Sequence, residues 1–320
     1  MAVIKSVLLL IVGFIVLVKA SDIFVDAVSS ISTNLKMSKM MIALTVAAFG
    51  TCAPELAISF QSMGSGMGDI ALANVLGSNV VNILLIVGLA ACVAPIKVKN
   101  HVIKKELPIL LVVTSMFCLC IISHKFGISN QQYVLDRQDG FMLLCFFGMF
   151  MFYILSVVQA KQGILEYDKP KYGIVKSIIY SIICCVVILF SSDLVVDNAV
   201  SLAKLIGVST KIITMTVVVI GTSLPEMTMT VIAAKKGEFD FALGNIIGTN
   251  IFNIGVVLGL PLVIYGGFNS TSFNMVDVVA VFIAAVSLFL FARNDKKLSS
   301  LEGALMMSIF VMYYAYVLLT

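Results

Sequence analysis

Charged residues are scarce in this chain. Lys, Arg, Asp and Glu together make up 12% of its 320 residues, whereas about 25% is typical of a soluble domain. Hydrophobic residues make up 60%, and the mean hydropathy is +1.10. This composition excludes a soluble globular protein and indicates a polytopic membrane protein whose first partner is the lipid bilayer.

Tryptophan is absent, and histidine is nearly so. The two histidines, His101 and His124, fall in loops, and no His-Glu-x-x-His motif is present, so an intramembrane metalloenzyme is disfavoured. The cysteines fall within or at the end of apolar stretches, and we interpret them as small apolar residues and not as a disulfide or zinc framework. They are Cys52, Cys92, Cys118, Cys120, Cys145, Cys184 and Cys185.

About ten apolar stretches are each long enough, at roughly 20 residues, to cross a bilayer as a helix. They predict an all-α fold with ten transmembrane helices. We place these helices near residues 3–30, 39–62, 69–94, 104–123, 139–160, 174–203, 210–234, 240–265, 274–292 and 300–319. The first stretch resembles a signal peptide, but it has a repeat partner later in the chain, so we expect it to be retained.

Basic residues are distributed unevenly over the predicted loops. If the loops alternate between the two sides of a membrane, Lys5, Lys125, Arg137, Lys204 and Lys211 lie on one side. The other side carries Lys36, Lys39, Lys97, Lys99, Lys104, Lys105, Lys161, Lys169, Lys171, Lys176, Lys235, Lys236, Arg293, Lys296 and Lys297. Because cytoplasmic loops are enriched in Lys and Arg, we expect both termini to face outward.

The chain contains an internal repeat with an offset of 171 residues. Polar residues match without gaps, which chance similarity between apolar helices does not produce. The matched pairs include Asp22 and Asp193, Asp26 and Asp197, Ser38 and Ser209, Thr51 and Thr222, Pro54 and Pro225, Glu55 and Glu226, Asn74 and Asn245, Asn79 and Asn250, and Asn82 and Asn253. The repeat divides the chain into two five-helix halves, residues 1–160 and 174–320, joined by a linker at 161–173.

Five predicted helices separate each residue from its repeat partner. Because five is odd, the two halves cross the membrane in opposite directions, as in many secondary transporters, whose sites lie at the midplane between the halves. We therefore expect Glu55 and Glu226 to approach a common centre from opposite sides.

Each half contains Gly-Thr-x-x-Pro-Glu within a long apolar stretch, at residues 50–55 and 221–226. A carboxylate there costs roughly 3 kcal/mol or more and needs a cation to offset it. Proline cannot donate to the carbonyl four residues earlier, so the helix opens at the motif. The freed carbonyl, the threonine hydroxyl and the glutamate are oxygen donors of the kind that Na⁺ or Ca²⁺ prefers.

Polar residues spaced four apart form a stripe on the next helix of each half. The stripes are Asn74, Ser78 and Asn82, and Asn245, Thr249 and Asn253. For Asn74 and Asn245, hydrogen bonding between closely packed helices is as good an interpretation as ion binding. For the deeper four residues we favour ion coordination. Asp22 and Asp26 near the end of the first helix are interpreted as polar packing or capping.

These duplicated motifs resemble the alpha repeats of the calcium/cation antiporter superfamily, specifically its bacterial and archaeal sodium/calcium exchanger branch. The resemblance covers essentially the whole chain. It implies a bacterial or archaeal cytoplasmic membrane protein in which the first and sixth helices slide against the others. It implies no cofactor and no nucleic-acid or protein partner, and it is compatible with a monomer.

The resemblance also implies a set of ion ligands. Glu55 and Glu226 would bridge Ca²⁺ with the carbonyls of Thr51 and Thr222. Two flanking Na⁺ sites would use Ala48, Cys52 and Ser78, and Val219, Ser223 and Thr249, while Asn82 and Asn253 would line the centre. Two departures are evident, because Cys52 replaces a serine, and a thiol binds Na⁺ poorly, while Asn253 stands where some relatives carry Asp.

The sequence therefore predicts an antiporter that exchanges Na⁺ for Ca²⁺ by alternating access and exports Ca²⁺. A proton/calcium antiporter is the alternative, because a buried Glu can carry a proton. The hydroxyl groups in both halves favour Na⁺. An intramembrane enzyme and a channel are disfavoured, the first by the lack of catalytic motifs and the second by the repeat.

Overall fold

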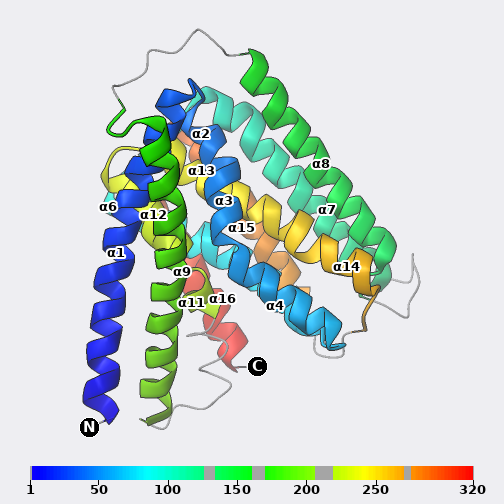
Figure 1. Ribbon diagram of the computed structural model, residues 1–320. Helices are drawn as coiled ribbons and strands as arrows, with labels where there is room; N and C mark the ends of the chain where they lie inside the picture. The colour runs from blue at the N-terminus through cyan, green and yellow to red at the C-terminus, as the bar shows by residue number, and fades with distance from the viewer. Residues whose placement is uncertain (1, 126–133, 161–169, 206–218, 270–274, 320) are drawn as a thin grey trace.

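The computed structural model describes residues 2–125, 134–160, 170–205, 219–269 and 275–319. These residues are almost entirely helical (Figure 1). The elements are α1 Ala2–Asn34, α2 Lys39–Ile42, η1 Ala43–Ala47, α3 Ala48–Thr51, α4 Ala53–Gly64, α5 Gly68–Val80, η2 Val81–Val87, α6 Gly88–Val93, β1 Ile96–Lys97, η3 Val102–Glu106, α7 Leu107–Lys125, α8 Arg137–Ala160, α9 Ile174–Leu205, α11 Val219–Thr222, α12 Leu224–Lys235, α13 Phe239–Phe252, η5 Asn253–Leu258, α14 Gly259–Tyr265, α15 Met275–Asn294, β2 Lys297–Leu298 and α16 Ser300–Leu319. The η elements are π-helical turns that continue the flanking helices.

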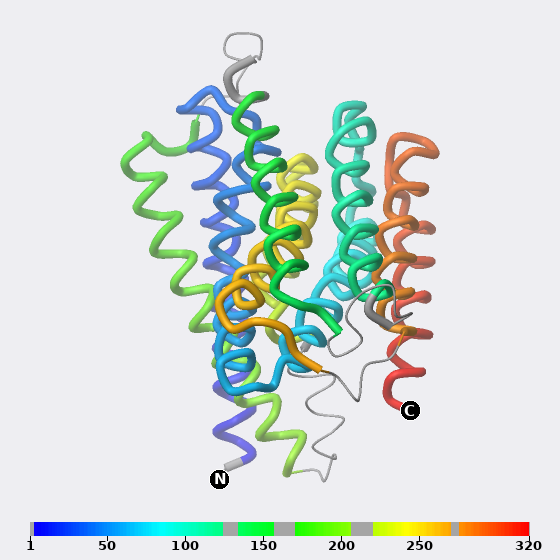
Figure 2. Tube along the Cα trace, turned by 90° about the vertical axis from the view of Figure 1, so that its right-hand side faces the viewer, coloured from blue at the N-terminus to red at the C-terminus, as the bar shows by residue number. Residues whose placement is uncertain are grey.

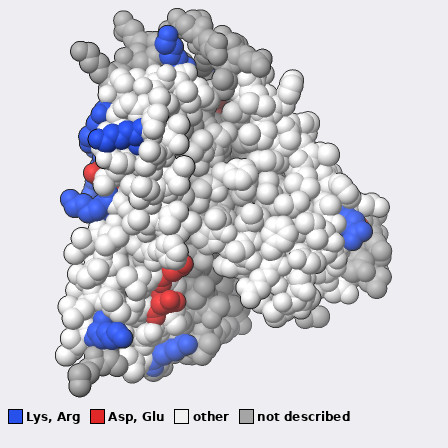
Figure 3. Space-filling view, in the orientation of Figure 1, with Lys and Arg blue, Asp and Glu red and all other residues white. Residues whose placement is uncertain are grey.

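Eight helices in the described ranges are long and apolar enough to cross a membrane, and a bent pair, α2–α3 with α4, makes nine. The predicted helix at 210–234 is described only from residue 219. The helices α1 and α9 extend beyond their predicted ends, to Asn34 and Leu205. Most of the surface seen in Figure 3 carries no charged side chain, as the interior of a bilayer requires. The membrane-protein prediction is confirmed.

Two helical spans form the centre of the molecule. In the most apolar part of α5–η2–α6, 78% of the residues are buried, and in that of α13–η5–α14 the share is 83%. The same share is 17% for α1 and 28% for α9. The helices α1 and α9 pack along each other at the periphery, as Figure 1 shows. The polar stripes therefore lie on the best-shielded helices, and the α1–α9 pair covers one side of them.

Loops that are far apart in the sequence meet at the two ends of the bundle. At one end Lys99 pairs with Asp240 at 2.6 Å, and β1 pairs antiparallel with β2. At the other end Leu135 forms a backbone bridge with Phe268. Figure 2 shows that α1 begins and α16 ends toward the same end of the bundle. The first end gathers the lysine-rich loops, so the charge asymmetry of the sequence becomes an asymmetry of the fold.

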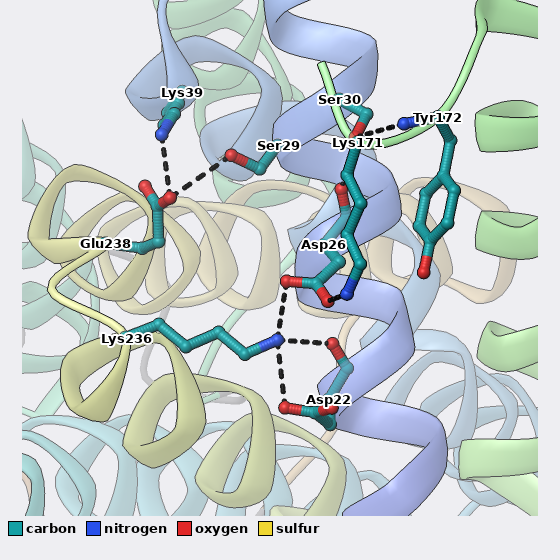
Figure 4. A network of polar contacts seen from close by, with 9 residues as sticks. All are labelled: Asp22, Asp26, Ser29, Ser30, Lys39, Lys171, Tyr172, Lys236 and Glu238. Atoms are coloured by element: carbon teal, nitrogen blue, oxygen red, sulfur yellow. Dashed lines mark hydrogen bonds and ion pairs between the residues drawn. The ribbon is translucent and has the colours of Figure 1, made fainter. Parts of the chain in front are cut away.

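Ion pairs connect the second half of α1 to the rest of the molecule (Figure 4). Asp26 lies 2.6 Å from Lys171 in the linker and 2.6 Å from Lys236 after α12. Lys236 also contacts the carboxylate of Asp22 at 2.9 Å. The hydrogen bond with Asp26 raises the pKa of the Lys171 amine, so this lysine stays charged. Asp22 and Asp26 thus anchor a peripheral helix by ion pairs, in keeping with their predicted structural role.

A neighbouring contact extends this network to α2 (Figure 4). The carboxylate of Glu238, at the start of α13, accepts hydrogen bonds from Lys39 at 2.7 Å and from the Ser29 hydroxyl at 3.3 Å. The network therefore joins α1, α2, the linker and the turn between α12 and α13 in one polar cluster.

We expect Asp26→Ala to lower the thermal stability of the purified protein. The substitution removes two ion pairs, each contributing about 1 kcal/mol or less. The repeat partner Asp197 is exposed and has no ion pair with a lysine or arginine in the described chain, so Asp197→Ala is the matched control. A larger fall in Tm for Asp26→Ala than for Asp197→Ala checks the prediction. Equal effects would show that the ion pairs contribute nothing.

Candidate functional site

Both Pro-Glu motifs lie at helix breaks. The chain leaves helical geometry at Cys52, with φ −78° and ψ 5°, and at Ser223, with φ −89° and ψ 7°. At the first break, α4 is bent by 48° relative to the helix that runs from α2 to α3. Proline occupies one of the first two positions of α4 and of α12, where its missing N–H costs least. Each glutamate follows in the first turn, where the positive end of the helix dipole favours a negative charge.

The two glutamate side chains are fully shielded from solvent. Glu55 is 1% exposed and Glu226 is 0% exposed. Oε2 of Glu55 and both carboxylate oxygens of Glu226 have no hydrogen-bond partner, and neither side chain pairs with a Lys, Arg or His in the described residues. The carboxylates are close enough to act electrostatically on each other. Two adjacent, unpaired carboxyl groups in a dry interior require either protons or cations.

Each glutamate helix packs against the asparagine-bearing turn of the other half. The helix α4 contacts η5, which begins at Asn253, and α12 contacts η2, which contains Asn82. The short helices before the breaks also contact the other half, because α3 contacts α13 and α11 contacts α5. The two halves of the chain therefore meet at the glutamates, as the repeat predicts.

Neutral oxygen atoms without partners occur at the second helix break and on the central spans that pack against the glutamate helices. The residues that carry them are all at most 1% exposed. They are Ser78 Oγ, Asn82 Oδ1, Ser223 Oγ, Thr249 Oγ1 and Asn253 Oδ1. Buried polar groups normally have a hydrogen-bond partner. A cluster of unpartnered oxygen atoms is what a site for a desolvated hard cation supplies.

The remaining predicted ligands are more varied. The Thr51 hydroxyl donates to the carbonyls of Ala47 and Ala48, and the Ala48 carbonyl also accepts from the Cys52 amide at 3.2 Å. The Ala48 carbonyl is thus already engaged within its own helix turn. Thr222 is half-buried at the end of α11. The side chain of Val219, the first residue of α11, lies outside the described residues.

Cys52 is fully buried between the two halves. Its thiol lies near the hydroxyls of Thr51 and Thr249 and near both glutamates. The resemblance assigned Cys52 and Thr249 to different flanking sites, and that assignment stays a prediction.

Asn74 and Asn245 hold neighbouring helices together. The side-chain amide of Asn74 donates to the carbonyl of Glu55 at 3.3 Å, and that of Asn245 donates to the Thr230 hydroxyl at 3.2 Å. Of the two interpretations left open by the sequence, these contacts favour helix packing.

Three residues at the site were not assigned from the sequence. The carbonyls freed by the two prolines contact α9, because the Cys185 thiol lies 3.6 Å from the Gly50 oxygen and the Ser192 hydroxyl donates to the Gly221 oxygen at 3.1 Å. Asn79 Oδ1 accepts from the Asn253 amide at 3.3 Å. The repeat pairs Asn79 with Asn250, which had singled out Asn79 as a polar residue shared by the two halves. Nothing in the sequence indicated the contacts with α9.

Comparisons with known proteins show what the chain is similar to. The chain is 34% identical over 320 residues to the putative antiporter CaxA of Alkalimonas amylolytica, covering 96% of this chain and 97% of that protein. It is 30% identical over 338 residues to the sodium/calcium exchanger MaX1 of Methanosarcina acetivorans, covering 96% of each chain. A solved structure of the sodium-calcium exchanger NCX_Mj, soaked with 10 mM Na⁺ and zero Ca²⁺, is 30% identical. It superposes with a TM-score of 0.82 over 98% of this chain and 99% of that one.

The sequence model of the sodium/calcium exchanger protein family matches residues 5–156 and 176–319. This match covers nearly the whole chain and both Pro-Glu motifs. The chain therefore belongs to the sodium/calcium exchanger family.

Proposed function

We propose that the chain is a secondary antiporter that exchanges Na⁺ for Ca²⁺ across a bacterial or archaeal cytoplasmic membrane by alternating access. The observation that carries this proposal is the pair of adjacent, buried carboxyl groups of Glu55 and Glu226, which no basic side chain in the described residues neutralises. One Ca²⁺ or two Na⁺ balance two negative charges. Occupancy by one ion species therefore excludes the other, which is the basis of exchange.

The ligands in this proposal are those that the resemblance implies. Glu55 and Glu226, with the backbone carbonyls of Thr51 and Thr222, bind Ca²⁺. Asn82 and Asn253 line the centre with amide oxygens. Unpartnered hydroxyls complete the Na⁺ sites at Ser78, Ser223 and Thr249. Three of the predicted ligands contribute at most a backbone oxygen: Ala48, Cys52 and Val219. Ala48 and Val219 have no donor atom in the side chain, and the thiol of Cys52 is a poor ligand for a hard cation.

Alternating access in this proposal is a movement of α1 and α9, the first and sixth of ten spans, against the other eight. The ten spans form two inverted five-helix halves. The α1–α9 pair is peripheral and touches both helix breaks through α9. Bare carboxylates would oppose closure of the site, because closure removes them from water. Only the loaded protein moves readily, so ions are exchanged and do not leak.

The direction of transport follows from the orientation. The loops rich in lysine gather at one end of the bundle, and the positive-inside rule places that end in the cytoplasm with both termini outside. With the usual inward Na⁺ gradient, Na⁺ entry would drive Ca²⁺ export.

Calcium flux in proteoliposomes tests the proposal. Vesicles loaded with Na⁺ and diluted into Na⁺-free buffer should accumulate ⁴⁵Ca²⁺, and vesicles with an imposed pH gradient and equal Na⁺ should not. Uptake driven by the pH gradient alone would instead identify a proton/calcium antiporter, the alternative that buried carboxyl groups also permit.

Cys52→Ser is expected to lower the Na⁺ concentration needed for half-maximal exchange by a few-fold, because a hydroxyl is a better Na⁺ ligand than a thiol. The mirror substitution Ser223→Cys should raise it, since Ser223 Oγ is buried and unpartnered. The Na⁺ dependence of ⁴⁵Ca²⁺ flux measures both. If Cys52→Ser leaves this dependence unchanged, the side chain at position 52 is not a ligand.

A further inference from the structure

A groove lies between α7 and α8, on the side of the bundle where α8 runs at the edge of the molecule (Figure 1). Its volume is about 440 Å³, within the roughly 300–1,000 Å³ common for small-molecule sites. Apolar side chains form most of its wall, including Ile109, Val112, Phe146 and Met149. Val112 is 50% exposed and Met149 is 56% exposed. In a transmembrane region such an open apolar groove faces lipid chains and not water.

Two lysine side chains lie at one end of this groove. Lys104 and Lys105 line it, and both are exposed. Neither forms an ion pair with an acidic side chain in the described part of the chain. The nearby carboxylate of Glu106 is already engaged, because it accepts a hydrogen bond from Tyr153 at 2.7 Å and faces His101 at 3.5 Å. Among the described residues, no neighbouring carboxylate therefore balances the positive charge at the groove mouth.

The two lysines are consecutive residues of η3, the turn that continues as α7. Two like charges this close together repel each other, and a bound anion would offset the repulsion.

The lysines also lie at the end of the bundle where the basic loops gather, the end that our topology places in the cytoplasm. Anionic phospholipids give membranes a negative surface that attracts such basic clusters. Lys105 lies 5.9 Å from the centre of the Tyr153 ring, which places the ammonium group over the upper wall of the groove. The groove thus combines a basic mouth with an apolar channel below it.

We propose that this groove binds one anionic phospholipid, with the phosphate at Lys104 and Lys105 and an acyl chain along the wall formed by α7 and α8. The two lysines favour a negatively charged headgroup. The exposed apolar wall favours an acyl chain. The inference does not depend on which ions the protein transports.

Native mass spectrometry of the full-length protein in detergent tests this proposal. Phosphatidylglycerol and phosphatidylcholine with identical acyl chains are compared as probes, with inorganic phosphate as a competitor. The wild type should bind one phosphatidylglycerol in preference to phosphatidylcholine. The double substitution Lys104→Ala with Lys105→Ala should weaken phosphatidylglycerol binding about thirtyfold, since each lysine near a membrane surface contributes about fivefold.

Two further variants separate the groove from a general effect of charge. Lys97→Ala with Lys297→Ala removes two exposed lysines from the β1–β2 pair at the same end and should leave binding unchanged. Val112→Phe adds bulk to the groove without changing its charge and should reduce occupancy by either lipid. The proposal is wrong if both double variants weaken binding equally, if phosphatidylcholine binds as well as phosphatidylglycerol, or if millimolar phosphate displaces the lipid.

Discussion

Glu226→Gln is expected to abolish Na⁺-driven ⁴⁵Ca²⁺ uptake into proteoliposomes. Glutamine keeps the volume of the side chain and removes one of two charges. Ca²⁺ would then leave an unbalanced positive charge in a site that is fully buried. Removing one partner of a buried charge pair costs about 3–5 kcal/mol, or a factor of more than about a hundred in affinity.

The same loss is expected for Glu55→Gln, because Glu226 acts electrostatically on Glu55 and our proposal assigns both carboxyl groups to one site. Asp295→Asn is the control, since Asp295 is exposed in the turn between α15 and β2. Exchange close to that of the wild type in either glutamine variant would reject the role assigned to that glutamate. A loss of exchange in the control would show that the assay responds to charge in general.

Gly248→Ala is expected to cause the second large effect, a loss of both stability and exchange. A Cβ at this position would lie 2.6 Å from the backbone oxygen of Leu44 and 2.8 Å from its Cα. Backbone atoms cannot move aside as a side chain can, so α13 must shift away from η1. Overpacking of this kind costs about 1–3 kcal/mol.

The shift would also disturb the site, because Thr249 is the next residue of α13 and its hydroxyl lies beside Cys52. Binding sites tolerate displacements of only about 0.5 Å. Gly148→Ala is the matched control, since a Cβ there meets no atom within 4 Å. Thermal unfolding and ⁴⁵Ca²⁺ flux measure the two effects. Equal behaviour of the two alanine variants would contradict the close contact between α13 and η1.

The sequence was sufficient to predict the helix breaks and the family. Pro54 and Pro225 each remove a backbone donor, and an apolar stretch cannot hold Glu55 or Glu226 without a cation, so local chemistry determines both conclusions. Both helix breaks are present, and the family is confirmed by the match over nearly the whole chain. The ligand set, the ten spans and the inverted arrangement of the halves stay predictions.

Contacts between distant elements could not be predicted. The 171-residue offset relates Asp26 to Asp197, yet within the described ranges Asp26 has lysine partners and Asp197 has none. The partners of Asp26 come from the linker and from the end of α12. Cys185 occupies a position whose repeat partner is Phe14, so symmetry gave no hint of its contact with Gly50. Such contacts depend on how helices pack, which no local pattern records.

The π-helical turns were not predicted either. Asn82 lies in η2, and Asn253 begins η5, at matching places in the two central spans. A π-helical turn widens the helix by one residue and is common at functional sites. The sequence shows only a polar residue in an apolar helix at these positions, which an ordinary α-helix accommodates equally well.

Equilibrium binding of ⁴⁵Ca²⁺ to the purified protein, titrated with Na⁺, tests most directly whether two carboxyl groups are shared between the ions. We predict that Na⁺ displaces Ca²⁺ completely and that the displacement curve is steeper than for one-to-one competition, because two monovalent ions must replace one divalent ion. Bound Ca²⁺ that is insensitive to Na⁺, or that is displaced with a one-to-one curve, would contradict a common site at Glu55 and Glu226.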